Sequence, residues 1–221
     1  MDSIRWFTNT SVPQAIELAA AEHKPLLVDF WSPTCRGCAK LFATTYPDPR
    51  VRRLLAESFV CIKYDTKAPN EWFRRLNGSF AHLWHPGIVV LDARLSEARR
   101  FVGFLPPEEF MAQLQVGAGL VHLYHGRPEQ ALERFELVTT TLPRTAVVPE
   151  AMYWAGVAQY RRGGGLDALR LVWERLAAEH PESDWANRAD CLDVVIPPEG
   201  FSMADPGSVQ LLSPDHRLAA G

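Results

Sequence analysis

Two cysteines separated by two residues, Cys35 and Cys38, are the residues of this chain best placed for chemistry. They follow an apolar run, Leu26 to Phe30, and precede a stretch of helical character that starts at Ala39. Two intervening residues bring both sulfurs onto one helical turn, and the first thiol lies where unpaired backbone N–H groups and the helix dipole favour a thiolate. The spacing therefore predicts a redox-active pair that can form and open a disulfide.

Half of a zinc site is the alternative interpretation of this pair. Such a site normally needs a second cysteine pair at similar spacing, and the remaining cysteines, Cys61 and Cys191, stand alone in the sequence. Cys61 lies in an apolar segment and is predicted to be an inert core thiol, and Cys191 is predicted to be a buried apolar residue. The pattern therefore favours redox chemistry.

Length, charge and hydropathy narrow the class of protein. The chain has 221 residues and a formal net charge of −3, without the clustered Lys and Arg that a nucleic-acid partner requires. Its first residues lack a basic leader with an apolar core, and no later stretch is apolar over the length of a bilayer. We therefore expect a cytoplasmic protein with no nucleic-acid and no membrane partner, where a lone cysteine pair is more often catalytic than structural.

The elements that must position the pair alternate between strands and helices. Apolar runs bounded by prolines and turn residues predict strands at residues 26–31, 59–65, 88–91 and 100–103. Helical periodicity and start signals, including a capping box at Ser11 and Gln14, predict helices at residues 11–23, from 35, at 48–57, at 69–76 and from 106. This order predicts a central mixed sheet with helices on both faces.

These residues resemble the thioredoxin fold, in the branch that extends the helix after the CxxC motif. Three separate features carry the resemblance over about half of the chain. They are Val28-Asp29-Phe30-Trp31 before the cysteines, the CxxC motif itself, and the segment from His85 to Asp92, where the family keeps a strand that begins at a cis-proline. Two positions depart from the family pattern: Thr34 replaces the usual Trp, and Arg36-Gly37 replaces the usual Gly-Pro.

The resemblance implies roles for the thiols and for a carboxylate. Cys35 would be the attacking thiolate and Cys38 would resolve the mixed disulfide. Asp29 matches a buried carboxylate under the resolving cysteine, where desolvation raises its pKa and lets it accept the proton of Cys38. Arg36 would favour the thiolate by its positive charge. The alternatives are a structural role for Asp29 and a solvated surface charge for Arg36.

His85, Pro86 and Arg36 are the residues expected to bind substrate. Pro86 would have a cis peptide bond and leave the preceding backbone free to pair with an extended substrate. His85 would then face the sulfurs, where it could tune the thiolate, shuttle a proton or fill the rim. With Cys35, Cys38 and His82 it could also offer a soft metal site.

The second half of the chain carries an internal repeat. Small and large residues recur after 37 positions, namely Gly119, Gly126, Ala131 and Phe135 as Gly156, Gly163, Ala168 and Val172. The spacing is similar to tetratricopeptide helix pairs, with about three extra residues expected at 144–149. A helix from Ser183 to Val195 would cap the stack. His122 and His125 lie one turn apart without a third ligand nearby, which favours a surface or interdomain role over metal binding.

The sequence as a whole predicts an α/β thioredoxin-like three-layer domain with a central mixed sheet at 1–112. All-α tetratricopeptide-like helical repeats with a capping helix follow at 113–196, and a disordered tail at 197–221. We expect a thiol–disulfide oxidoreductase that acts on protein disulfides without a cofactor or metal, with the repeats positioning the substrate or an unidentified protein partner. The alternatives are a non-catalytic protein-binding adaptor of the same fold, and metal or cluster handling by Cys35, Cys38 and His85.

Overall fold

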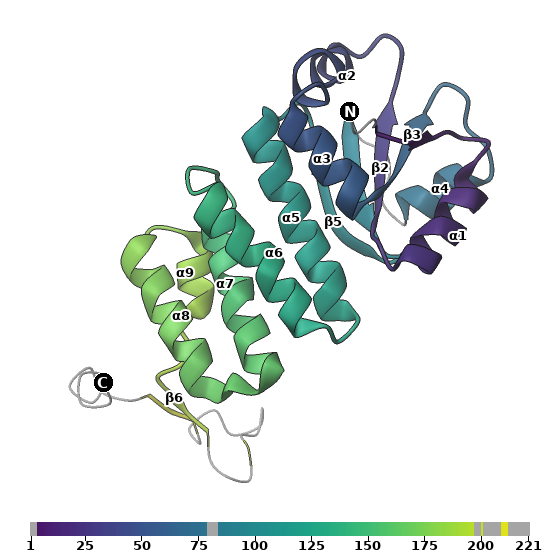
Figure 1. Ribbon diagram of the computed structural model, residues 1–221. Coiled ribbons are helices and arrows are strands. Elements are labelled where there is room, and N and C mark those ends of the chain that lie inside the picture. The colour runs from purple at the N-terminus through teal and green to yellow at the C-terminus, as the bar shows by residue number, and fades with distance from the viewer. Residues whose placement is uncertain (1–3, 79–83, 197–199, 201–208, 212–221) are drawn as a thin grey trace.

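A computed structural model describes residues 4–78, 84–196, 200 and 209–211 of the chain. His82 and most of the predicted tail lie outside these residues. A mixed five-stranded sheet with helices on both faces occupies the first half, and a helical region follows it (Figure 1). This architecture confirms the predicted fold class.

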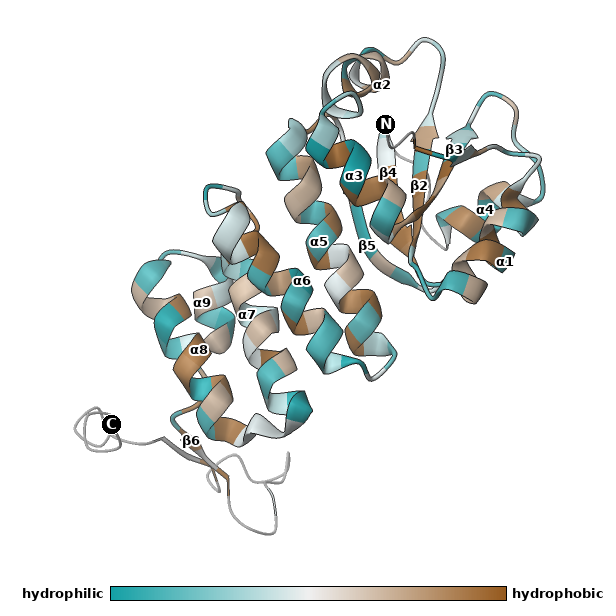
Figure 2. Cartoon of the chain, in the orientation of Figure 1, coloured by the Kyte–Doolittle hydropathy of each residue, from teal (hydrophilic) through white to brown (hydrophobic). Residues whose placement is uncertain are grey.

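The sheet has the strand order β1-β3-β2-β4-β5. Its strands are β1 (Trp6–Phe7), β2 (Leu26–Trp31), β3 (Val60–Asp65), β4 (Gly87–Leu91) and β5 (Glu97–Val102). β1, β2 and β3 are mutually parallel, whereas β4 runs antiparallel to both β2 and β5. The central strand β2 is an almost unbroken apolar run because both of its faces are covered, and it is mostly brown in Figure 2.

Alternate residues of the strands enter two different cores. Leu27, Cys61 and Ile88 pack with the helices α3 (Pro49–Ser58) and α5 (Pro107–Tyr124), and with Leu41, which directly follows the short helix α2 (Arg36–Lys40). Leu26, Val28 and Ile62 pack on the opposite face with α1 (Val12–Glu22) and α4 (Trp72–Asn77). A π-helical turn, η1 (Leu41–Thr45), continues α2. The period of two along each strand therefore produces three layers.

Most predicted elements lie where the sequence placed them, with local differences. Asp48 caps α3 as expected, because its carboxylate accepts a hydrogen bond from the Arg50 backbone N–H at 2.8 Å. The predicted capping box at Ser11 is wrong: its side chain does not cap α1, and its hydroxyl oxygen instead accepts a hydrogen bond from the Thr8 backbone N–H at 2.8 Å. The short strand β1 was not predicted.

The helical region continues from α5 through α6 (Pro128–Thr141) and α7 (Val148–Gln159). The π-helical turn η2 (Tyr160–Gly164), α8 (Gly165–Glu179) and α9 (Asp184–Ala189) complete it. Gly119 on α5 faces the ring of Phe135 on α6, and Gly156 on α7 faces Trp173 on α8. Small residues thus let paired helices approach at both predicted places, while the tetratricopeptide assignment itself stays a prediction.

The end of the helical region differs from the prediction at Cys191. The capping helix α9 ends at Ala189, and Cys191 lies in the turn that precedes β6 (Val194–Val195). Cys191 is therefore exposed, and the prediction that it is buried is wrong. A second, two-stranded sheet pairs β6 with β7 (Gln210–Leu211).

The helix α5 joins the two regions, because it contacts both. Gly117 faces Val90 of the sheet, while Gly119, two residues further on, faces α6. Near the start of α7, Glu150 pairs with Arg99 of β5 through two hydrogen bonds of 2.7 and 2.8 Å. The predicted boundary between residues 112 and 113 falls inside α5, and the division of the chain into domains stays a prediction.

Candidate functional site

Cys35 and Cys38 form a disulfide directly after β2, at the start of α2. Their Cα atoms are 5.2 Å apart, within the usual range for a disulfide. Cys35 is the N-cap residue of α2 and is partly exposed, whereas Cys38 is buried. The Cys38 backbone N–H donates a hydrogen bond of 3.0 Å to Cys35 Sγ. This N–H would stabilise a thiolate at Cys35, so the geometry favours Cys35 as the nucleophile.

A pocket of about 340 Å³ opens beside Cys35. It is lined by Ser32, Thr34, Cys35, Arg36, Gly37, Trp84 and His85. Arg36 is exposed, and Trp84 is the most exposed large apolar side chain of this rim, at 70%. The structure therefore brings two of the three residues predicted to bind substrate, Arg36 and His85, into one pocket with Cys35.

The third of these residues, Pro86, follows a cis peptide bond with His85, as predicted. Gly37 allows Pro86 to approach α2 closely, because a Cβ atom at Gly37 would lie 2.9 Å from Pro86 Cδ. Any larger residue at position 37 would push the proline away from the turn that holds the cysteines. This contact explains a glycine between the two cysteines.

His85 is held on the side of β3. Its Nε2 atom lies 2.7 Å from Thr66 Oγ1, within hydrogen-bonding distance. Burial lowers the pKa of His85, and the positive charge of Lys67 lowers it further, while Asp29 partly opposes both effects. The imidazole is therefore favoured in its neutral form, which can donate or accept a proton according to its tautomer.

Asp29 lies in β2 and is 1% exposed. Its Oδ2 atom accepts a hydrogen bond of 2.8 Å from the Tyr46 hydroxyl and lies 3.3 Å from Lys63 Nζ. Its Oδ1 atom is buried and has no hydrogen-bond partner within the described residues. Burial raises the pKa of this carboxyl above its ordinary value, and the attraction of Lys63 and the hydrogen bond of Tyr46 only partly counteract that effect.

Lys63 is a part of the site that the sequence reasoning missed. Its ammonium group lies among four aromatic rings, at 4.7 Å from the centroid of Tyr46, 5.1 Å from Trp6, 5.3 Å from Phe42 and 5.9 Å from Trp31. Such contacts stabilise a desolvated cation. A signal did exist, since Asp29 and Lys63 are opposite charges in neighbouring apolar strands, and the parallel register places them side by side.

The described residues lack two features that other functions would require. They contain no group of three or more His, Cys, Asp and Glu side chains that could hold a metal ion. Among the same residues, no helix combines the length and the apolar character that crossing a bilayer requires.

Comparison with known proteins gives relatives for the first half of the chain. A family described as "Thioredoxin-like domain" matches residues 12–118. The thiol:disulfide interchange protein DsbD of Ralstonia nicotianae is 32% identical over 111 residues, which cover 50% of this chain and 18% of that protein. DsbD of Yersinia pestis is 31% identical over 100 residues, which cover 44% of this chain and 17% of that protein. A thioredoxin from Thermus thermophilus, solved in solution, is 29% identical with a TM-score of 0.43, covering 52% of this chain and 86% of that one. The chain thus spans less than a fifth of the length of either DsbD protein.

Proposed function

Because residues 12–118 form a thioredoxin-like domain that is related to DsbD proteins, we propose that this protein is a thiol–disulfide oxidoreductase that reduces protein disulfides. The observation that carries the proposal is the asymmetry of the cysteine pair. Cys35 is partly exposed at a helix N-terminus and accepts a backbone N–H, while Cys38 is buried one turn behind it. Such a pair has one thiol for attack and one for resolution.

The proposed reaction is a pair of exchange steps. The Cys35 thiolate attacks one sulfur of a substrate disulfide, forms a mixed disulfide, and releases the other substrate sulfur as a thiolate. The Cys38 thiolate then attacks Cys35 Sγ, which forms the bond seen in the structure and releases the second substrate thiolate. The substrate gains two electrons, the pair loses two, and an electron donor must reduce the pair before the next cycle.

Asp29 is proposed as the acceptor of the Cys38 proton. Its raised pKa brings the carboxyl closer to the pKa of a thiol, which makes proton transfer between the two groups less unfavourable. The Oδ1 atom supports this role, because it is buried without a partner while Tyr46 and Lys63 occupy Oδ2. Tyr46 and Lys63 would therefore hold the carboxylate in place and leave one oxygen for the proton.

Substrate would lie across the pocket beside Cys35. We assign the contacts to His85, Pro86 and Arg36, with an extended segment of the substrate pairing with the backbone before Pro86. Arg36 would also stabilise the Cys35 thiolate by its charge, which moves the couple toward the oxidising side of thioredoxin. The helical region is proposed to position the substrate or a partner protein.

Trapping with single-cysteine variants tests the proposal. Cys38→Ser should accumulate mixed disulfides through Cys35, because resolution is removed, whereas Cys35→Ser should accumulate far fewer. Both variants should lose insulin reduction that the wild-type protein shows with dithiothreitol as electron donor. If neither variant alters client capture or insulin reduction, the oxidoreductase proposal is wrong and a binding adaptor is favoured.

We also propose a cytoplasmic location. The redox potential of the Cys35–Cys38 couple, measured against glutathione, tests the direction of flux. A value near that of thioredoxin, about −270 mV, fits a reductant of the cytosol, whereas a value near about −120 mV fits an oxidant. Metal analysis of protein purified without oxygen tests the third hypothesis. Stoichiometric metal that is lost in Cys35→Ser would favour metal handling over the proposed function.

A further inference from the structure

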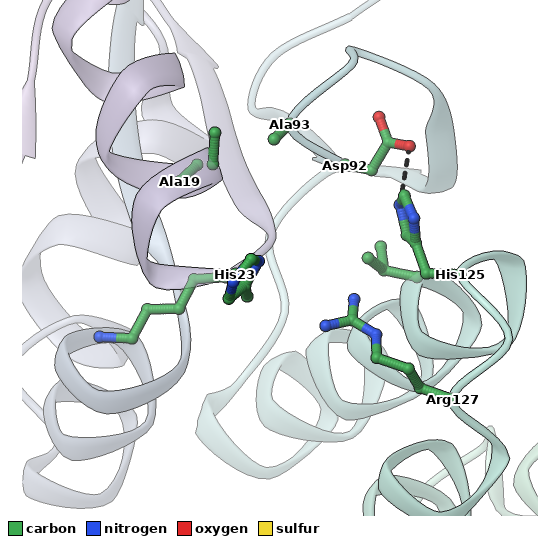
Figure 3. A pocket seen from close by; sticks show the side chains of 9 residues that line it. Ala19, His23, Asp92, Ala93, His125 and Arg127 are labelled. Atoms are coloured by element: carbon green, nitrogen blue, oxygen red, sulfur yellow. Dashed lines mark hydrogen bonds and ion pairs between the residues drawn. The ribbon is translucent and has the colours of Figure 1, made fainter.

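A second pocket, of about 420 Å³, lies at the other end of β2 from the cysteines. Its walls come from the end of α1, the turn between β4 and β5, and the corner between α5 and α6 (Figure 3). It shares no residue with the pocket beside Cys35. Its volume falls within the range of sites for small molecules.

The pocket is lined by apolar and by charged or polar side chains in nearly equal number. Four of the lining residues have small apolar side chains, namely Ala19, Ala20, Ala93 and Val121. The remaining lining residues are four bases, His23, Lys24, His125 and Arg127, and one acid, Asp92. The composition therefore favours a ligand with an anionic end and an apolar part.

The one acid of the pocket is already engaged. Asp92 Oδ2 lies 3.1 Å from His125 Nε2, as the dashed line in Figure 3 shows. Its Oδ1 atom accepts hydrogen bonds of 2.8 Å from the backbone N–H groups of Arg94 and Ser96. Lys24 is also neutralised, because its Nζ lies 2.7 Å from Glu22 Oε2. His23 and Arg127 are therefore the two bases of the pocket for which the described residues provide no ion pair with an acid.

Arg127 has a positive charge that no ion pair neutralises within the described part of the chain. Its Nε atom is buried without a hydrogen-bond partner, and within the described residues its side chain forms no ion pair. Figure 3 shows the guanidinium directed into the space between His23 and His125. The pKa of nearby His122 is lowered to about 4, first by burial and then by the charges of Arg127, Arg134 and His125. Arg127 is thus one of three positive groups that act on His122 beside this pocket.

The geometry points to a site for a phosphoryl group, and we propose that this pocket binds a small molecule through it. The planar guanidinium of Arg127 matches two oxygens of such a group, and the His23 ring offers a further donor from another direction. A phosphoryl group has three acceptor oxygens that point in different directions and carries up to two charges, whereas a carboxylate has two coplanar oxygens and one charge, so donors from several directions favour the phosphoryl group. The 14-residue helix α6 begins directly after Arg127 and adds the positive end of its dipole.

Titration of the full-length protein with two probes tests the site. Inorganic phosphate and phenyl phosphate are added at pH 7.5 and followed by two-dimensional amide NMR, with sodium chloride at equal ionic strength as the control. We expect saturable shifts at residues 19–24, 92–93 and 125–127. Tighter binding of phenyl phosphate would identify a phosphate ester as the ligand, because its ring can contact the apolar lining residues, and equal binding would identify free phosphate.

A matched pair of arginine variants tests whether the Arg127 side chain contributes to phosphate affinity. Arg127→Gln should weaken phosphate binding by about tenfold or more, the loss of a charge-assisted hydrogen bond. Arg144→Gln makes the same charge change at an exposed loop position and should leave affinity unchanged. If Arg127→Gln does not fold, His23→Gln supplies the test through its own loss of affinity.

Absence of saturable shifts, equal shifts with sodium chloride, or equal affinity in Arg127→Gln and wild type would overturn the phosphate site. The result is independent of the proposed redox function, because the titration measures binding and uses no disulfide substrate.

Discussion

Replacement of Gly37 by alanine would test the packing that holds the cysteine turn against the proline loop. The new methyl group would lie 2.9 Å from Pro86 Cδ and 3.6 Å from the His85 carbonyl oxygen. Carbon atoms in favourable contact are about 3.5–4.0 Å apart, so the turn and the proline must separate by about 0.6 Å or more. The Cδ atom belongs to a ring that is bonded to the backbone at both ends, and it cannot rotate away.

The expected loss of stability is the difference between two terms. Overpacking of a close contact costs about 1–3 kcal/mol, and alanine in place of glycine inside a helix returns up to about 1 kcal/mol. A net destabilisation of about 1 kcal/mol should lower Tm by about 2–4 °C in a chain of this length. Displacement of the pocket relative to Cys35 should also slow insulin reduction by about tenfold, since a shift of 1 Å can cost about a hundredfold.

Thermal unfolding of the oxidised proteins and the insulin assay measure the two effects. The matched control is Ala39→Gly, an exposed position of the same helix, which should lose about 1 kcal/mol of helix propensity and keep its activity. A Gly37→Ala protein that melts above wild type and reduces insulin at the wild-type rate would refute the argument, because helix propensity would then be the sole effect.

Three further predictions concern the buried carboxyl, the helix contacts and the free thiols. Burial raises the folded-state pKa of Asp29, so the protonated carboxyl stabilises the fold at low pH and this contribution is lost as the pH rises through that pKa. The free energy of unfolding of Asp29→Asn, measured with urea, should therefore rise relative to that of wild type as the pH rises. A difference between the two proteins that falls with pH would contradict this reasoning. Gly119→Ala should lower the free energy of unfolding by about 1–3 kcal/mol, because its methyl group meets the Phe135 ring. A double-mutant cycle with Phe135→Leu that shows no coupling would disprove the contact. Burial also raises the pKa of Cys61, so iodoacetamide should label exposed Cys191 in the folded protein and reach Cys61 only after unfolding. Equal labelling rates of the two cysteines, measured by mass spectrometry, would contradict this prediction.

Elements whose signals are local could be predicted from the sequence. The strand at Leu26–Trp31 follows from an apolar run between prolines, and the start of α3 follows from Asp48 before Pro49. The strand β1 is only two residues long and carries no usable period. The predicted burial of Cys191 is wrong because it assumes a capping helix that continues past Ala189, where the chain turns instead.

Of the candidate site, too, only the parts with a local signal could be predicted from the sequence. The spacing of Cys35 and Cys38 indicates their pairing directly, and the resemblance to thioredoxins adds Pro86 and its cis bond. The contacts of Asp29 could not be read from spacing, since they depend on the register of two strands and on where η1 returns to the sheet. Tyr46 lies 17 residues from Asp29 in sequence and donates a hydrogen bond to it in the fold.

The helix α5 has a consequence for how the chain melts. It is 18 residues long, and one of its faces packs on the sheet while another packs on α6. Neither region can lose this helix without exposing the apolar surface of the other, so heat should unfold both in a single cooperative transition. Cleavage after residue 112 would cut α5, which belongs to the cores of both regions, and each fragment would be left with an incomplete core.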